Sequence, residues 1–265
     1  MDERLWILGA GDPEMEAIEG LLRSVGENVV YAMNSGKRVH PGNAYKGEIS
    51  SNTTSLSATE IFLVECEVPV MEGVWWTVID HHRPGDPGYG QPPENFWEAS
   101  SVGQVFAKLE EIYGEHFADE QSVSQLRLVA AADHCLGSAY RGECPGIDPN
   151  ALMEWRIRSR AKFQNRPVEE VMRDVEKARK ALRAASRVAE LPGHVADFRS
   201  GTIPELPEAA AREGIAFLAE MNDRGRRKVV LQAANSKQVA KFLVTYPAVG
   251  KYGDPARGFA GGYLE

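Results

Sequence analysis

The chain has 265 residues, 43% of them hydrophobic, and a formal net charge of −8. This length and apolar content suffice for a real core in one large or two smaller domains. The negative charge argues against a protein that grips long nucleic acid through its phosphates, because that task needs a broad basic face. No run of about 18 apolar residues could span a membrane, and three cysteines without metal-finger spacing are typical of a reduced cytoplasm. We therefore expect a cytoplasmic protein.

The first predicted strand lies in the apolar run 4–11, which leads through a tight turn into a helix start. Three acidic residues gather at this junction: Asp12, Glu14 and Glu16. Carboxylates in a first helical turn are ordinary capping chemistry. Capping accounts for one or two of them and does not obviously account for all three, so the junction is also a candidate ligand site.

A second strand is predicted over residues 28–33. The loop that follows, residues 34–46, combines cations, an imidazole and an aromatic ring. Such a mixture could stack a base and contact a phosphate, although loops of this composition are commonly only connections. Both interpretations stay open for this segment.

Two further predicted strands end directly in candidate ligands. The apolar segment 60–64 runs into Glu65, and the segment 73–79 runs into Asp80, His81 and His82. The carboxyl ends of buried strands are where open α/β sheets bind ligands. Carboxylate and imidazole are common metal ligands, but one segment alone does not close a metal site.

A helical apolar pattern over residues 126–132 leads into Asp133 and His134. After a loop rich in glycine and proline, helices are predicted over 151–161 and from Pro167 to about residue 188, where apolar residues recur at helical spacing. The opposite face of the long helix is rich in arginine, which most simply indicates a solvated face. The sequence Leu191-Pro192-Gly193 marks a boundary.

A smaller C-terminal unit is predicted beyond this boundary. It offers a helix over 207–221, a strand over 228–233, a short helix over 236–241 and a strand over 242–246. The last stretch, residues 250–263, is dense in glycine and carries two cations. It fits either a loop that holds a phosphate or a flexible tail.

Five segments together resemble the motifs of the DHH phosphoesterase superfamily, which includes RecJ-type exonucleases, oligoribonucleases, cyclic-dinucleotide phosphodiesterases and manganese-dependent inorganic pyrophosphatases. Residues 78–83 match the name-giving Asp-His-His motif fully. Residues 10–18 resemble the first motif and residues 62–65 the second. Residues 99–102 resemble the turn with small hydroxyl residues, and residues 131–134 resemble the fourth motif. The resemblance covers about residues 5–140.

The resemblance implies an α/β fold with a parallel-sheet domain that has helices on both faces, plus a smaller C-terminal α/β domain. We expect a DHH-like metal-binding domain over residues 1–160, a connecting helix over 161–192 and a substrate-binding domain over 193–265. The C-terminal unit is small, so we expect it to lean on the first domain or on a second copy of the chain in a homodimer.

The resemblance also implies a site with one or two Mn²⁺ or Mg²⁺ ions. Its expected ligands are Glu14, Glu16, Glu65, Asp80, His82 and Asp133, with Glu65 as the bridging ligand. His81 is expected to act beside the reacting phosphate as a positioning group or acid. This chain differs from the family pattern at Ala10, where the family has a histidine, and in carrying glutamate where the family has three aspartates. Glutamate keeps the charge and oxygen donors and adds one methylene, which predicts a site of altered dimensions.

Divalent ions held by carboxylates polarise phosphoryl oxygens and lower the pKa of water. The guanidinium of Arg83 could clamp a phosphate oxygen, or it could be a surface arginine paired with Asp86. Further substrate contacts implied by the resemblance are Ser100, Ser101, Arg257, Gly261 and Gly262.

The sequence therefore favours a metal-dependent phosphoesterase that hydrolyses a small nucleotide, a short oligonucleotide or a related phosphate compound, with a pyrophosphatase as a second enzyme class. The alternative is a catalytically silent relative that binds a nucleotide or serves in an assembly, because the first-motif histidine and all three aspartates are replaced.

Overall fold

The computed structural model describes residues 4–49, 58–70, 73–223, 225–255 and 257–265. The chain forms two compact units, one of Met1–Cys135 with Gly142–Leu152 and one of Leu136–Arg141 with Met153–Glu265. The expected α/β class, with a parallel sheet and a separate C-terminal sheet, is confirmed. Metal binding by residues 1–160 and substrate binding by 193–265 stay predictions. Across the described ranges, no helix combines the length and apolarity needed to cross a bilayer.

A parallel sheet of four strands, counted over the described ranges, forms the centre of the first unit. Its order is β2-β1-β5-β6. The strands are β1 (Arg4–Leu8), β2 (Asn28–Tyr31), β5 (Glu60–Val64) and β6 (Trp75–Ile79). Leu8 pairs with Val64, which pairs with Ile79, so three strands end level with one another. The residues that follow β1, β5 and β6 therefore emerge at one edge of the sheet.

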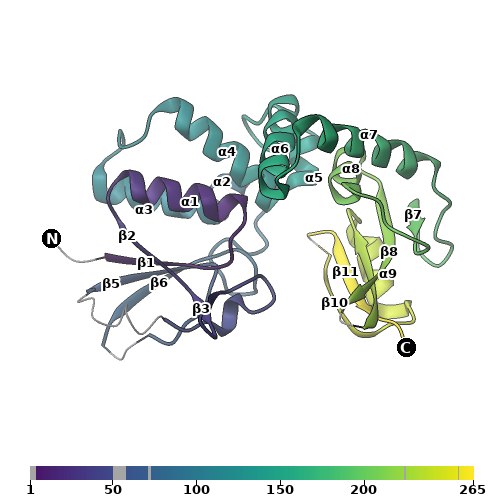
Figure 1. Ribbon diagram of the computed structural model, residues 1–265, viewed down its shortest axis with the longest axis horizontal. Coiled ribbons are helices and arrows are strands. Elements are labelled where there is room, and N and C mark those ends of the chain that lie inside the picture. Colours follow the sequence, from purple (N-terminus) through teal and green to yellow (C-terminus); the bar gives the residue numbers. More distant parts are fainter. Residues whose placement is uncertain (1–3, 50–57, 71–72, 224, 256) are drawn as a thin grey trace. The chain divides into compact units, whose positions relative to one another are not determined.

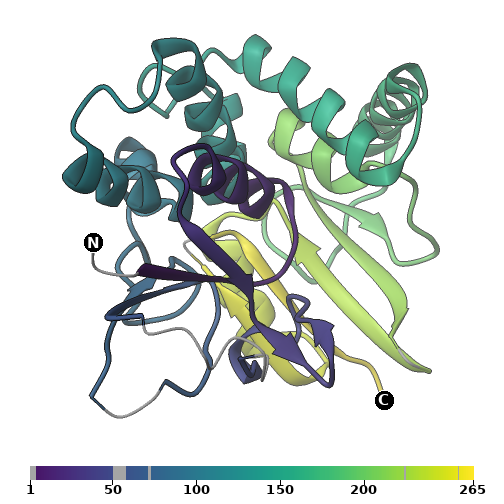
Figure 2. The same ribbon diagram turned by 60° about the vertical axis from the view of Figure 1, so that its left-hand side comes forward.

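Helices cover one face of this sheet (Figures 1 and 2). They are α1 (Pro13–Ser24), α3 (Ser101–Tyr113) and α4 (Glu120–His134), with the short η2 (Pro93–Asn95) and α2 (Phe96–Ala99) before α3. Met15, Ile18 and Leu22 of α1 are fully buried at helical spacing. Beneath them, the rings of Trp6 and Phe62 stack 4.0 Å apart.

The opposite face carries a second layer built from residues 32–49. This segment contains β3 (Met33–Asn34), β4 (Lys37–Arg38) and the 3-10 helix η1 (Ala44–Lys46). Its apolar side chains pack against alternate residues of β1 and β5, such as Ile7 and Leu63. Because both faces of β1 and β5 are buried, these two strands are almost continuously apolar.

The second unit is built on a mixed sheet, of five strands within the described ranges, in the order β10-β11-β9-β8-β7. The strands are β7 (Val195–Phe198), β8 (Ala216–Asp223), β9 (Arg226–Gln232), β10 (Val249–Asp254) and β11 (Phe259–Tyr263). Among the described strands of this sheet, β7 and β8 pair in parallel and the other neighbours pair antiparallel. Most of the glycine-dense stretch thus lies in the paired strands β10 and β11, which excludes the flexible-tail interpretation.

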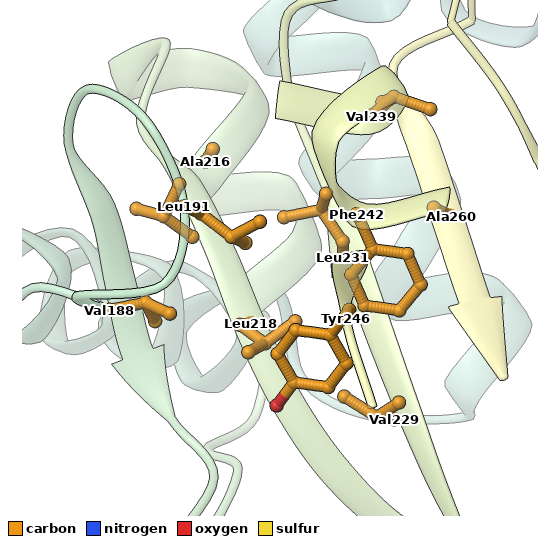
Figure 3. Close-up of a cluster of buried hydrophobic side chains, with 11 residues drawn as sticks. Val188, Leu191, Ala216, Leu218, Val229, Leu231, Val239, Phe242, Tyr246 and Ala260 are labelled. Carbon is orange, nitrogen blue, oxygen red and sulfur yellow. The ribbon is translucent and has the colours of Figure 1, made fainter. Parts of the chain in front are cut away.

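Helices pack on both faces of the second sheet. The described helices that follow α4 are α5 (Leu136–Tyr140), α6 (Pro149–Gln164), α7 (Val168–Ala184), α8 (Leu206–Glu213) and α9 (Ser236–Thr245). Leu182 of α7 and the apolar side of α8 pack with Phe217. On the other face, Val239 and Phe242 of α9 pack with Leu218 (Figure 3).

Two predicted elements of this unit are wrong. The helix expected over 207–221 stops at Glu213, because Gly214 adopts the left-handed conformation that ends helices, and β8 begins two residues later. The strand expected over 242–246 continues α9 instead. A capping box between Asn235 and Gln238 starts this helix, and packing of Phe242 outweighs the strand preference of its neighbours.

Candidate metal centre

Four loops and helix ends bring acidic and imidazole side chains to the carboxyl edge of the first sheet. Glu65 follows β5, and the triplet Asp80-His81-His82 follows β6. Glu14 lies in the first turn of α1, whose N-terminus is capped by Asp12 through a 2.8 Å hydrogen bond from Met15. Asp133 comes from the last turn of α4. Segments up to 119 residues apart in sequence therefore meet here, from Glu14 to Asp133 (133 − 14).

The ligand-type atoms of Glu65, His81, His82 and Asp133 all lie within 4.8 Å of one another. His81 Nε2 is 3.0 Å from Asp133 Oδ2 and 3.6 Å from Glu65 Oε1. It is also 3.9 Å from Glu14 Oε2, which adds a third carboxylate to its surroundings. We call these five residues the acidic cluster.

When the carboxylates are ionised and His81 Nε2 carries no hydrogen, four buried atoms of the acidic cluster have no hydrogen-bond partner among the described residues. They are Glu14 Oε2, Glu65 Oε1, His81 Nε2 and Asp133 Oδ2. A buried polar atom without a partner typically costs about 1–3 kcal/mol. Four of them aimed at one place are the pattern expected of a cation site, since one divalent ion would satisfy all four at once. The acidic cluster therefore fits a metal ion, with nitrogen and oxygen donors in the numbers that such sites use.

The electrostatics of the acidic cluster show an excess of negative charge. Burial, followed by the neighbouring Asp133 and Glu65, raises the pKa of Glu14 well above its usual value. The same three causes raise the pKa of Asp12 to about 7. Burial alone would lower the pKa of His81, but contacts with Asp133 and Glu65 raise it to about 9. The crowding of negative charge therefore favours the protonated form of each of these groups.

Glu65 adopts an unusual backbone conformation, with a φ of 50°. A non-glycine residue in this left-handed region is strained and persists only where its surroundings fix it. Its amide is held by a 3.0 Å hydrogen bond to the carbonyl of Ile79, at the end of the neighbouring strand. This conformation turns the Glu65 carboxylate toward His81 and His82.

Asp80 organises the triplet rather than pointing into the acidic cluster. Its Oδ1 accepts hydrogen bonds from the amides of His81 and His82 and lies 2.9 Å from His82 Nδ1. Its Oδ2 accepts from the hydroxyl of Tyr45 at 2.9 Å. Burial alone would raise the pKa of Asp80, but these donors, led by His82, lower it. An ionised Asp80 only accepts, so His82 Nδ1 donates to it; this nitrogen is also the one that lies 3.9 Å from Glu65 Oε1.

The loop after the triplet packs tightly at Gly88. A side-chain carbon added there would lie 1.9 Å from the carbonyl oxygen of Ala99 and 2.8 Å from His81 Cβ. Gly88→Ala is therefore expected to lower the free energy of unfolding by about 1–3 kcal/mol. Urea denaturation measures this change. In the matched control Gly20→Ala, the added carbon meets nothing within 4 Å and lies on a helix, so stability should rise by up to about 1 kcal/mol. Equal effects of both substitutions would contradict this account of the loop.

The remaining predicted residues of the first unit lie around the acidic cluster in different settings. Glu16 is exposed on α1 and is not part of the cluster. Ser100 caps α3, accepting from the Gly103 amide at 3.1 Å and donating to the Trp97 carbonyl. Ser101 is fully buried, and its hydroxyl has no partner among the described residues.

Arg83 lies over the ring of Tyr45, with its central carbon 3.7 Å from the ring centre. It also pairs with Glu67 at 3.1 Å, while Asp86 lies at 3.9 Å. Both interpretations of this arginine have a basis in these contacts, because the side chain has surface ion pairs and also sits directly beside the triplet.

A second arginine, Arg38, also lies near the acidic cluster. The sequence pattern predicts for it only a place in the loop 34–46, which could contact a phosphate. Its Nε donates to the carbonyl of Gly9 at 2.9 Å, and its guanidinium lies over the ring of Tyr31 at 4.1 Å. A side-chain carbon on Gly11 would be 3.6 Å from its Nη1. No carboxylate among the described residues lies within ion-pair distance of it, so Arg38 is a cation held beside the first loop of the site.

The predicted substrate residues of the C-terminal unit lie in its β10–β11 hairpin. Gly261 and Gly262 are buried in β11, where the side chains of Tyr252 and Ala248 pack against their backbone. Arg257 is exposed in the turn before β11. These two glycines are accounted for by packing, and a substrate contact at these three residues stays a prediction.

No protein-family model matches the chain, and no curated protein matches it either. Among solved structures, PggH, a pGpG-specific phosphodiesterase from Vibrio cholerae, is similar at 13% identity with a TM-score of 0.47 over 99% of this chain and 93% of its own. An uncharacterized protein from Helicobacter pylori G27 is similar at 12% identity with a TM-score of 0.31 over 99% of this chain and 93% of its own. Similarity at this level decides nothing about function, so the functional argument rests on the residues.

Proposed function

We propose that this chain is a divalent-metal-dependent phosphoesterase of the DHH type, with its metal site in the acidic cluster. The observation that carries the proposal is the convergence of four buried, unpartnered atoms on one place. When bound, a divalent ion supplies Lewis acidity to a phosphoryl oxygen and to water. The buried carboxylates and imidazoles would hold that ion in a fixed position.

Four residues would hold the ion: Glu65, His81, His82 and Asp133. Glu14 would add a fifth donor through Oε2. Its other oxygen, Oε1, already accepts a 2.9 Å hydrogen bond from the amide of Val102, which holds the carboxylate in place. In this assignment His81 is a ligand, which differs from the role of acid or positioning group that the family resemblance implied. Two imidazoles among four donors favour Mn²⁺ over Mg²⁺, since Mg²⁺ prefers oxygen donors.

A phosphorylated substrate would meet two cations beside the acidic cluster, Arg38 and Arg83. The guanidinium of each lies over a tyrosine ring, at 4.1 Å for Arg38 and 3.7 Å for Arg83. The planar guanidinium of arginine suits the two-pronged binding of a phosphate. Together with the chain's net charge of −8, two local cations favour a small nucleotide or short oligonucleotide over a long nucleic acid.

Arg38→Gln is expected to raise KM for a phosphate-containing substrate about tenfold and to change kcat little, because Arg38 lies outside the ion's donor set. Steady-state kinetics with the ion in excess measures this. Lys37→Gln serves as the matched control, since Lys37 is the exposed neighbour on the same short strand. Loss of ion binding in Arg38→Gln, or an equal rise in KM in Lys37→Gln, would contradict the assignment.

One observation favours the second candidate, a catalytically silent relative that binds a nucleotide. Ala10 offers no ligand and Glu16 is exposed, so the donors for a second ion are not assembled among the described residues. A site with one ion could bind a phosphate without cleaving it. This candidate predicts ion-dependent nucleotide binding with no turnover.

The test is release of mononucleotide or phosphate with Mn²⁺ from linear dinucleotides, cyclic dinucleotides, mononucleotides and pyrophosphate. Turnover that disappears in His82→Ala and persists in His116→Ala, an exposed histidine outside the acidic cluster, would support the proposal and identify the substrate class. Silence across the panel with retained ion-dependent nucleotide binding would favour the second candidate. Absence of any ion binding would overturn both.

A further inference from the structure

A chain of hydrogen-bonding atoms runs behind His81, away from the acidic cluster. His81 Nδ1 lies 2.9 Å from His134 Nδ1, and His134 Nε2 lies 3.1 Å from the carbonyl oxygen of Gln91. The two imidazole rings are nearly parallel, with an angle of 22° between their planes. The other ring nitrogen of His81, Nε2, is the atom that faces Glu14, Glu65 and Asp133.

The direction of each hydrogen bond in this chain follows from the carbonyl at its end. The Gln91 oxygen can only accept, so His134 Nε2 carries the hydrogen. A neutral imidazole has one hydrogen, so His134 Nδ1 has a lone pair and accepts from His81 Nδ1. A neutral His81 therefore has its hydrogen on Nδ1 and a bare lone pair on Nε2.

This tautomer directs a lone pair at three carboxylates, the nearest oxygen being 3.0 Å away. A proton on Nε2 could form a hydrogen bond from His81 to one carboxylate, such as that of Asp133. The buried oxygens of Glu14 and Glu65 would then still have no hydrogen-bond partner among the described residues. A divalent cation satisfies the lone pair and all the oxygens together. The chain through His134 thus leaves His81 Nε2 in the form that a metal ligand requires.

We propose that His134 is a positioning residue that fixes the tautomer and ring orientation of His81 as a metal ligand. This inference rests on the proposed metal site. The role of His134 in this inference is separate from its position at the end of α4 and from the proposed ligand role of its neighbour Asp133. Outer hydrogen-bond partners of ligand histidines typically contribute 10- to 100-fold to metal affinity.

The test combines metal affinity with the tautomer of His81, using Zn²⁺ alone as a diamagnetic probe. Calorimetry is expected to show a 10- to 100-fold weaker affinity in His134→Leu. In His134→Asn the side-chain oxygen can take the place of Nδ1 as acceptor, so affinity should return to within about threefold of the wild type. His116→Leu, an exposed histidine outside the acidic cluster, is the matched control and should bind as the wild type does.

Long-range ¹⁵N–¹H correlation spectra of the zinc-loaded wild type give a readout that a merely structural role would not move. They are expected to show the hydrogen of His81 on Nδ1 and the ion on Nε2. A hydrogen on Nε2 would overturn the inference even if His134→Leu failed to fold. Unchanged affinity in His134→Leu would overturn it while leaving the proposed function intact, whereas a wild type that binds no Zn²⁺ or Mn²⁺ would overturn the proposed function itself.

Discussion

Glu65→Gln is expected to abolish ion binding and to lower turnover by at least about 100-fold, while making the metal-free protein more stable. The substitution removes one of the central charges among the ligands and keeps the size of the side chain and the strained backbone at this position. The new amide can donate to the unpartnered oxygens nearby, and a satisfied buried group typically contributes about 1–3 kcal/mol to the free energy of unfolding. Residues that a protein needs for function often lower the stability of its fold. Calorimetric titration with Mn²⁺ and urea denaturation in a chelator measure the two effects.

Glu60→Gln is the matched control for this prediction. It makes the same chemical change at the other end of the same strand, where Glu60 lies 3.7 Å from Lys108 in a partly exposed pair. Such pairs contribute about 0–1 kcal/mol, so ion binding and turnover should stay at wild-type levels. If Glu65→Gln destabilised the metal-free protein, the carboxylate would have a structural partner and the interpretation of the acidic cluster as a cation site would fail.

Much of the acidic cluster could be predicted from the sequence because parallel strands end at one edge. An apolar run that stops at Glu65 and another that stops at Asp80 must deliver their next residues side by side once the strands pair in parallel. The helix periodicity could also have separated Glu14 from Glu16. Residues two apart on a helix point in different directions, and α1 begins at Pro13, so only Glu14 turns inward.

The roles within the triplet could not be predicted, since they depend on contacts distant in sequence. Asp80 turns back onto its own loop partly because Tyr45, 35 residues earlier, donates to it. His81 turns into the acidic cluster with His134, 53 residues later, at its back. The sequence pattern fixes which residues reach the edge of the sheet, whereas the direction of each side chain is decided by tertiary packing around the turn.

Addition of Mn²⁺ to the metal-free protein is expected to stabilise the first unit and to leave the second unit unchanged. All proposed ligands belong to the first unit. An ion that binds only the native state stabilises it by about 2.7 kcal/mol at a free concentration 100 times Kd. For a unit of this size, that corresponds to a rise in melting temperature of roughly 5–10 °C.

Hydrogen exchange resolves this effect by region, because protection should increase in peptides from β1, β5 and α4 and not in those from β8 and β9. Mg²⁺ at the same concentration is the control. Its preference for oxygen ligands in a strict octahedron makes it a poor match for a donor set that includes two imidazoles. An equal shift with Mg²⁺ would mean that the carboxylates alone attract the ion and that His81 and His82 are not ligands. Protection that rose equally in β8 and β9 would contradict the prediction that the ion stabilises the first unit alone.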